Sequence, residues 1–252
     1  MFGKIFILGI VLVAGPSAAR AASADKTASA KSNEADFDKF DEEFGDKAKS
    51  AKPVRDPLSG YNRFMFQFND KFYFWVGKPL TKVYGLLLPQ PVRISVDRAF
   101  DNLRFPLRFV SSALQGKFKG AGRELGRFTV NSTLGIGGLF DPADHWMHIK
   151  PSDEDLGLVM GHYGVGYGFP VVLPILGQTN LRDGLGIIPN FFLHPIYYVT
   201  APKNFMAVSA GDKFNYLSLH GEEYEKIKKD ALDPYTFIRD AHIQYRENKI
   251  KE

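Results

Sequence analysis

Cysteine is absent from this chain of 252 residues. The absence excludes a disulfide framework, a thiol nucleophile and a metal site built on thiolates. It also excludes a cysteine that carries lipid after a secretory signal. Any attachment to a membrane therefore has to come from other side chains.

Sequence motifs of catalysis are missing as well. Residues 156–186 have the glycine density of a nucleotide-binding loop, but neither its spacing nor its lysine. Gly-x-Ser-x-Gly and His-Glu-x-x-His do not occur either. We therefore expect no enzyme, no metal and no cofactor. The alternatives are a metal site of Asp141, Asp144, His145 and His148, and a general-base pair of His162 with Asp183.

Long apolar runs are lacking in the chain after residue 21. No uninterrupted run of 18 apolar residues occurs in that part of the sequence. The sequence therefore predicts no helix that spans a membrane. Residues 1–21 contain Lys4, an apolar run over residues 5–14 and small residues near position 21. This pattern is typical of a cleavable secretory signal peptide, with a retained membrane anchor as the alternative.

A strong excess of charge of one sign is missing too. The net charge is +4, and the charged residues are scattered rather than gathered into the stripe that nucleic-acid binding needs. Removal of residues 1–21 takes away Lys4 and Arg20 and no acidic residue, which leaves the chain nearly neutral. We expect no nucleic-acid partner.

Residues 22–55 are rich in alanine, serine, lysine and aspartate and poor in large aliphatic residues. Such a segment buries too little apolar surface to offset the entropy lost on ordering, so we predict a flexible polar leader. Phe37, Phe40 and Phe44 stand at helical spacing within it. They indicate either a short docking helix or a disordered acidic patch.

Aromatic residues are what the chain has in excess, at 14% of its length. Residues 56–76 combine an Asp-Pro turn with a helical pattern that places one aromatic stripe along the helix. The stripe consists of Tyr61, Phe64, Met65, Phe68, Phe72 and Trp75, whereas Phe66, Tyr73 and Phe74 lie off it. The aromatics off the stripe predict either a lipid interface or packing against a second helix.

The block of residues 90–138 predicts three short helices. Pro106 breaks the first from the second, and the glycines at positions 135, 137 and 138 end the third. Glycine pairs at 116/120 and 122/126 predict close approach of helix backbones, with a loop at Gly116 and Gly120 as the alternative. Basic residues recur along the block, as on a helix at a lipid surface or on an ordinary solvated face.

Several long motifs resemble the MlaA/VacJ family of outer-membrane phospholipid-trafficking proteins, over about residues 55–247. The resemblance implies an all-α ring of amphipathic and interfacial helices with glycine-rich loops, formed by residues 56–252. The motifs are "DPLSGYNRFMFQFN" (56–69), "LPQPVR" (88–93), "FTVNSTLGIGGLFDPA" (128–143), "GHYGVGYGFPVVLPILGQTNLRDGLG" (161–186) and "DPYTFIRDAHIQYR" (233–246).

The resemblance also implies a function and partners. The ring would lie in the periplasmic leaflet of the outer membrane, beside a trimeric porin, with an amphipathic channel at its centre. Phospholipids mislocalised to the outer leaflet would pass through it to a periplasmic carrier protein, and lipid asymmetry would be maintained without any bond being made or broken. The chain departs from the family pattern by lacking a lipidated cysteine and by ending soon after the last motif, which puts contacts with the carrier in doubt.

Candidate site residues follow from these motifs. Asn62 and Asn69 are seven residues apart and share a helix face beside Arg63, so we predict that they line the lipid channel, together with Asn131. The alternative is that the amides cap or cross-link helices. A tightly turning loop is expected at Gly161, Tyr163, Gly164, Gly166, Tyr167 and Gly168, with Arg182 and Asp183 either holding it or forming an exposed pair.

Two other functions remain open at the level of sequence. One is a secreted protein of the envelope that holds lipid, or is structural, without transfer activity. The other is a periplasmic hydrolase that acts on lipid, which the missing motifs disfavour.

The signal region generates the first prediction. The mature protein should start between Ala22 and Asp25 and carry no acyl chain, because small residues precede these positions and the chain has no cysteine. The intact mass of the protein purified from membranes measures both properties. A mass increment of two or three fatty acyl groups would contradict the prediction.

Overall fold

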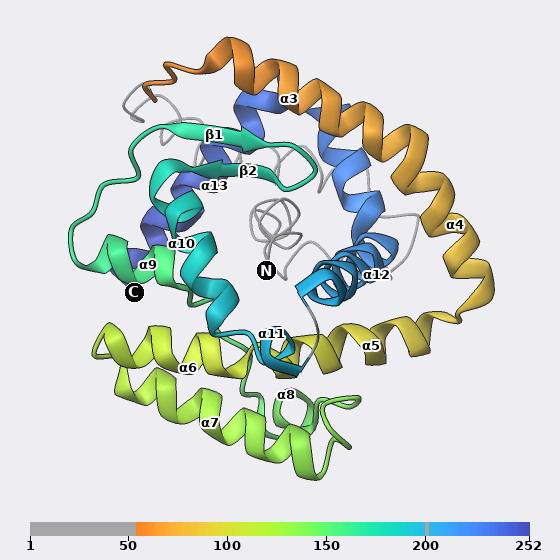
Figure 1. The fold of residues 1–252 in the computed structure, drawn as a ribbon, viewed down its shortest axis with the longest axis vertical. Helices are drawn as coiled ribbons and strands as arrows, with labels where there is room; N and C mark the ends of the chain where they lie inside the picture. Colours follow the sequence, from red (N-terminus) through yellow and green to blue (C-terminus); the bar gives the residue numbers. More distant parts are fainter. Residues whose placement is uncertain (1–53, 200–201) are drawn as a thin grey trace, which may run out of the picture.

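The computed structural model describes residues 54–199 and 202–252, so the predicted signal peptide, residues 22–53 of the leader and its phenylalanine helix lie outside the described residues. The first half of the described chain is helical and follows the rim of the molecule (Figure 1). Its elements are α3 (Ser59–Phe72), the π-helix η2 (Tyr73–Gly77), α4 (Lys78–Leu87), α5 (Gln90–Leu103), α6 (Phe105–Leu114), α7 (Phe118–Thr133) and α8 (Pro142–Met147).

Proline determines where several of these helices start. A proline occupies the first turn of α4, α5 and α6, where the missing N–H leaves no intrahelical hydrogen bond unmade. The break at Pro106 and the three helices of residues 90–138 are therefore confirmed. The glycine pair at 122/126 is different, because a Cβ at either position would meet nothing within 4 Å in the described chain. The expected close backbone approach was wrong at this pair.

The second half adds one small sheet to the helices. It contains α9 (Leu156–His162), β1 (Pro170–Leu173), β2 (Gly177–Asn180), α10 (Leu181–Phe192), α11 (Ile196–Val199), α12 (Pro202–Asp230) and α13 (Pro234–Lys251). The strands form an antiparallel hairpin in which Pro170 pairs with Asn180 and Leu173 with Gly177. The fold is mostly helical as expected, and the hairpin, which the sequence analysis did not predict, follows the predicted glycine-rich loop.

Helix α12 connects the two halves. It packs against α4 and α5, while α13 packs against α9 and β2, and α10 packs against α9 (Figure 1). Helix α10 lies nearer the middle of the molecule than α9, whereas α3 and α4 form the outer edge. This arrangement separates inner from outer helices, which matters for the exposed surfaces described below.

The apolar core is small and largely aromatic. The ring of Tyr73 packs edge-on against Tyr224 with centroids 5.2 Å apart, and the ring of Phe66 packs against Tyr235 at 5.9 Å. Val172 and Ile238 complete this cluster. Phe66 and Tyr73 thus pack against other helices, as the second of the two sequence interpretations stated, and not in lipid.

Helices α9 and α10 cross at glycines. A Cβ on Gly157 would lie 2.6 Å from Oδ1 of Asp183 and 2.8 Å from a guanidinium nitrogen of Arg246. A Cβ on Gly186 would lie 2.9 Å from the backbone nitrogen of Gly157. Only glycine permits this approach, which brings the charged residues of three helices together.

The crossing generates a stability prediction. Gly157→Ala should lower the free energy of unfolding by ~1–3 kcal/mol, because the new methyl group forces the charged side chains apart. The matched control is Gly184→Ala in α10, where a Cβ meets nothing within 4 Å. That change should raise stability by ~0.5–1 kcal/mol through helix propensity. Urea unfolding in detergent measures both, and equal stability of the two variants would contradict the packing described.

Candidate functional site

Helix α10 buries its polar face and exposes its apolar face. Its buried residues are Arg182, Asp183, Gly186 and Asn190. The residues on the opposite side of the helix, at a spacing of three and four, are exposed: Leu181, Leu185, Ile188 and Phe192. A helix at the surface of a water-soluble protein has the reverse arrangement.

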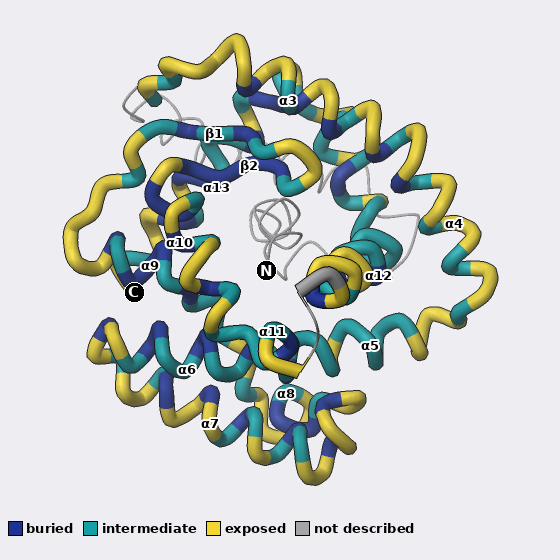
Figure 2. Tube along the Cα trace, in the orientation of Figure 1, coloured by how far each residue is buried: buried dark blue, intermediate teal, exposed yellow. Residues whose placement is uncertain are grey.

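Helix α3 shows this inversion only in part, because Phe66 is buried beside its asparagines and Arg63, Gln67 and Lys71 are exposed. Asn62 and Asn69 are buried on its inner face, whereas Phe64 and Phe68 are exposed on its outer face. Exposed residues dominate the outer edge of α3 and α4 in Figure 2. Across the described residues, 22 polar or charged residues are buried against 15 apolar ones, so inner packing depends more on hydrogen bonds and ion pairs than on apolar contact.

An exposed apolar belt follows the outer side of α3, η2 and α4. Trp75, near the middle of the belt, is 75% exposed. In water each such side chain forgoes ~1.5–3 kcal/mol of burial free energy. Exposed apolar side chains recur along all three helices, which indicates a surface that meets apolar material rather than water. Its members are Phe64, Phe68, Phe72, Trp75, Val76, Leu80, Val83, Leu86 and Leu87.

A second exposed apolar patch lies on the turn after α7 and on α8. It contains the other tryptophan of the chain, Trp146, which is 64% exposed. Within residues 54–199 and 202–252, no helix is both long and apolar enough to cross a membrane. The patch residues are Leu134, Ile136, Leu139, Phe140, Trp146 and Met147.

Arg246 of α13 forms the centre of a buried ion-pair network. Its guanidinium donates two hydrogen bonds to Asp155 at 2.7 and 2.8 Å, and Nε lies 2.7 Å from Asp183. Asp183 also pairs with Arg182 at 3.0 Å, and all four residues are buried. Burial opposes the ionised Asp183 carboxylate, but the charges of Arg246 and Arg182 lower its pKa to about 2. The network joins α9, α10 and α13.

Arg182 and Asp183 do not form the exposed pair that was one of the two expectations. A guanidinium nitrogen of Arg182 donates to the backbone carbonyl of Val165 at 3.4 Å, within the glycine-rich loop. The Asn180 side chain caps α10 by accepting from the Asp183 backbone nitrogen at 2.9 Å. Arg182 therefore contacts the loop, and the expectation that the pair holds the loop stays a prediction.

The glycine-rich loop is only partly a loop. Gly161 is buried within α9, where a Cβ would lie 2.4 Å from the side chain of Ile250. Gly164 and Gly168 have φ angles of 85° and 74°, which glycine adopts without strain. Gly166 and Tyr167 lie between these turns, and the Tyr163 hydroxyl donates to the carbonyl of Leu114 at 2.6 Å.

Asn62 and Asn69 join α3 to the hairpin. The Asn62 amide donates to the carbonyl of Pro170 and accepts from the backbone nitrogen of Val172, both at 2.9 Å. The Asn69 amide donates to the carbonyl of Leu173 at 2.9 Å and accepts from the backbone nitrogen of Ile175 at 2.7 Å. Asn62 has no exposed surface. This geometry favours the cross-linking alternative over channel lining.

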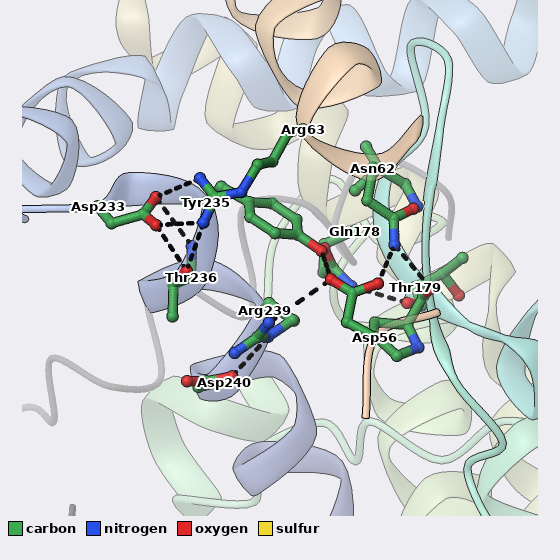
Figure 3. A network of polar contacts seen from close by, with 12 residues as sticks. Asp56, Asn62, Arg63, Gln178, Thr179, Asp233, Tyr235, Thr236, Arg239 and Asp240 are labelled. Atoms are coloured by element: carbon green, nitrogen blue, oxygen red, sulfur yellow. Dashed lines mark hydrogen bonds and ion pairs between the residues drawn. The ribbon is translucent and has the colours of Figure 1, made fainter. Parts of the chain in front are cut away.

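Asp56, near the start of the described chain, contacts residues of both α3 and α13 (Figure 3). It accepts from the Asn62 amide at 2.9 Å and from the hydroxyl of Tyr235, and it lies 3.5 Å from Arg239. Arg63 is exposed and pairs with Asp233, the N-cap of α13, at 2.7 Å. Of the three channel candidates on α3, only Arg63 therefore presents its side chain at the surface.

Asn131, the fourth channel candidate, is also buried. Its amide donates to Asp141 at 2.9 Å and accepts from the backbone nitrogen of Ala143 at 3.1 Å. Asp141 caps α8 and pairs with Arg127 at 2.8 Å. Asp141 is thus engaged in structure, and no cluster able to hold a metal ion occurs among the described residues.

A small cavity of about 30 Å³ lies where α5, α6, α10, α11 and α12 meet. Its lining includes the aromatic residues Phe100, Phe191 and Phe205 together with His194, Asp212 and Lys213. Arg104 forms a buried ion pair with Asp212. Burial lowers the pKa of the Lys213 ammonium to about 8, although Asp212 opposes this. Periodicity could not predict this cluster, because its residues come from several elements that are distant in the sequence.

The sequence profile of the MlaA lipoprotein family matches residues 54–249. The chain belongs to the MlaA lipoprotein family. An uncharacterised protein of Rickettsia bellii is 36% identical to it, with 79% of this chain and 78% of the relative covered. The Escherichia coli member, named intermembrane phospholipid transport system lipoprotein MlaA, is 31% identical over 75% of this chain and 76% of its own.

A solved structure supports the same family assignment. It comes from work on the structural basis for maintenance of bacterial outer-membrane lipid asymmetry, and it is 28% identical to this chain. The TM-score is 0.66, with 78% of this chain and 99% of that structure covered. The resemblance to the MlaA family and the mostly helical fold are therefore confirmed.

The Asn62 contacts generate a second stability prediction. Asn62→Leu should lower the free energy of unfolding by about 3 kcal/mol or more, because it leaves several buried partners unsatisfied at ~1–3 kcal/mol each. The control Gln67→Leu changes an exposed residue of the same helix and should alter stability by less than ~0.5 kcal/mol. Thermal unfolding measures both. A stably folded Asn62→Leu variant with altered lipid flux would support channel lining instead.

His242 of α13 generates a pH prediction. Burial lowers the pKa of its imidazole to about 4, so the folded state keeps it neutral while the unfolded chain protonates it below about 6.5. Between these values the unfolded state binds more protons, and stability falls with falling pH by up to ~1.4 kcal/mol per unit.

Unfolding measured from pH 7 to 4 should therefore have a shallower pH dependence in His242→Gln than in the parent protein. His162→Gln, a change at an exposed histidine of α9, is the control and should keep the parent slope. Equal slopes for His242→Gln and the parent would contradict the assignment.

Proposed function

We propose that the protein takes part in intermembrane phospholipid transport at the outer membrane. The observation that carries the proposal is the inverted burial of α10, whose polar face is buried and apolar face exposed, together with the exposed aromatic side chains of α3. Such a surface is stable when acyl chains cover it and costly when water does. The name of the Escherichia coli relative and the subject of the solved structure agree with this function.

The proposed direction of transport is inward from the outer leaflet. Phospholipids mislocalised there would be removed and passed to a periplasmic carrier protein, with the ring beside a trimeric porin. Passage of a charged headgroup through hydrocarbon costs many kcal/mol, and polar groups along a protein path reduce that barrier. No bond is made or broken, so no catalytic group is needed and the protein is not an enzyme in this proposal.

The proposed location is the periplasmic face of the outer membrane after removal of a signal peptide. The belt on α3, η2 and α4 would lie in the acyl region of the leaflet. Lys71 and Lys82 are exposed on the same helices and would meet phosphate groups. The belt would then supply the attachment that a lipidated cysteine supplies elsewhere in the family.

A reconstituted transfer assay tests the proposal. The protein, placed in donor vesicles, should raise the rate at which fluorescent phospholipid reaches an acceptor carrier or vesicle, with the lipid intact by mass spectrometry. Trp75→Ser with Val83→Ser in the belt should weaken vesicle association, whereas Gln67→Ser on α3 should not. Bound lipid without transfer would indicate a lipid-holding protein, and cleaved lipid would indicate a hydrolase.

A further inference from the structure

We propose that the acidic phenylalanine segment of the leader, residues 36–44, binds to an open groove on α7 of the same chain. Helix α7 lies on the outer side of α6 (Figure 1). This contact within one chain goes beyond phospholipid transport and does not depend on it. The groove is lined by Lys119, Gly122, Arg123 and Gly126 of α7 and by Ile149.

The groove carries positive charge that the described side chains leave without an acidic partner. Lys119 and Arg123 are exposed, and so is Lys150, which follows the lining residue Ile149. Within residues 54–199 and 202–252 no ion pair engages these three cations, whereas Lys117 just before α7 forms an ion pair at 2.8 Å. No acidic residue lines the groove. An acidic ligand therefore gains an attraction that no described residue already supplies.

The same side of α7 has a hollow between two apolar side chains. Phe118 is 74% exposed and Leu125 is 49% exposed, and Gly122 lies between them on one line along the helix. A Cβ at Gly122 or Gly126 would meet nothing within 4 Å in the described chain. Glycine inside a helix weakens it, and no described contact requires glycine at these two positions. The hollow leaves room for a bulky apolar side chain.

The leader segment is complementary to both features. Its sequence, DFDKFDEEF, contains five acidic residues and one lysine, which gives a net charge of −4. Phe37, Phe40 and Phe44 are three and four residues apart, so a helix places them on one face with acidic residues on both sides. Phenylalanine can then enter the hollow while carboxylates meet the cations of the rim.

Helix α13 shows that the segment can reach α7. Arg239 near the start of α13 lies 3.5 Å from Asp56, and the carbonyl of Lys249 near its end accepts from Lys117. The two α13 residues are ten apart, or about 15 Å along the helix axis. The twelve residues from Phe44 to Asp56 span up to ~40 Å when extended. A segment on the same chain also meets the groove at a roughly millimolar effective concentration, which favours it over an acidic segment of another molecule.

Photo-crosslinking within the full mature chain tests the inference. The protein carries p-benzoylphenylalanine in place of Phe40, which keeps an aromatic side chain there, and its crosslinks are mapped by mass spectrometry in detergent. They should fall on residues 118–126 and 149–150. In Lys119→Glu with Arg123→Glu the yield there should drop about tenfold, because two attractive contacts become repulsive.

Two further variants separate docking from a change in fold. Asp41→Lys with Glu43→Lys, added to the reversal on α7, should restore most of the yield, because the charges are then exchanged between the partners. Lys71→Glu with Lys82→Glu reverses two exposed lysines on α3 and α4 and should keep the parent yield. Crosslinks to α7 that survive the reversal, or that the exchange fails to restore, would overturn the inference.

Other occupants of the groove would give different results. In a mixture of isotope-labelled and unlabelled protein, the crosslinks should stay within one chain, and crosslinks between the two would assign the groove to a second copy. If the reversal on α7 abolishes binding to phosphatidylglycerol vesicles while crosslinks from position 40 fall elsewhere, the groove binds a lipid surface instead. Either result overturns the inference and leaves the proposed transport function untouched.

Discussion

The need to pair buried charge determines the architecture of this protein. Arg246 reaches Asp155 and Asp183 from a different helix, and removal of one partner from such a site costs ~3–5 kcal/mol because the other charge stays buried. Glycines at the crossing of α9 and α10 let the charged groups approach. These contacts replace much of the apolar packing that usually joins helices, and they leave apolar side chains to face outward.

The outward apolar surface follows from the same constraint. A helix that uses its polar face for internal contacts presents its other face to the surroundings, as α10 does. Amide cross-links from Asn62 and Asn69 fix the hairpin against α3 in the same manner. The interior thus holds the helices in position, and the exterior suits lipid, which is consistent with the function proposed for this member of the MlaA family.

Helix positions were predictable from the sequence, but burial was less so. Proline and glycine located the breaks around α5, α6 and α7, because their effects on the backbone are local. The inner position of Asn62 depends on a hairpin more than a hundred residues away, and periodicity alone does not tell which face of a helix meets protein. The hairpin was missed because four-residue strands beside glycines carry little signal, and the buried ion pairs join segments far apart in sequence.

Tryptophan fluorescence tests the central claim most directly. The chain has two tryptophans, Trp75 on the outer belt and Trp146 on the patch after α7, and both are exposed. In phospholipid vesicles, brominated acyl chains should quench Trp75 strongly in a Trp146→Phe variant, while iodide in the aqueous phase should quench it weakly. Strong quenching by iodide and none by brominated lipid, in protein bound to the vesicles, would show that the apolar exterior faces water and would contradict the account.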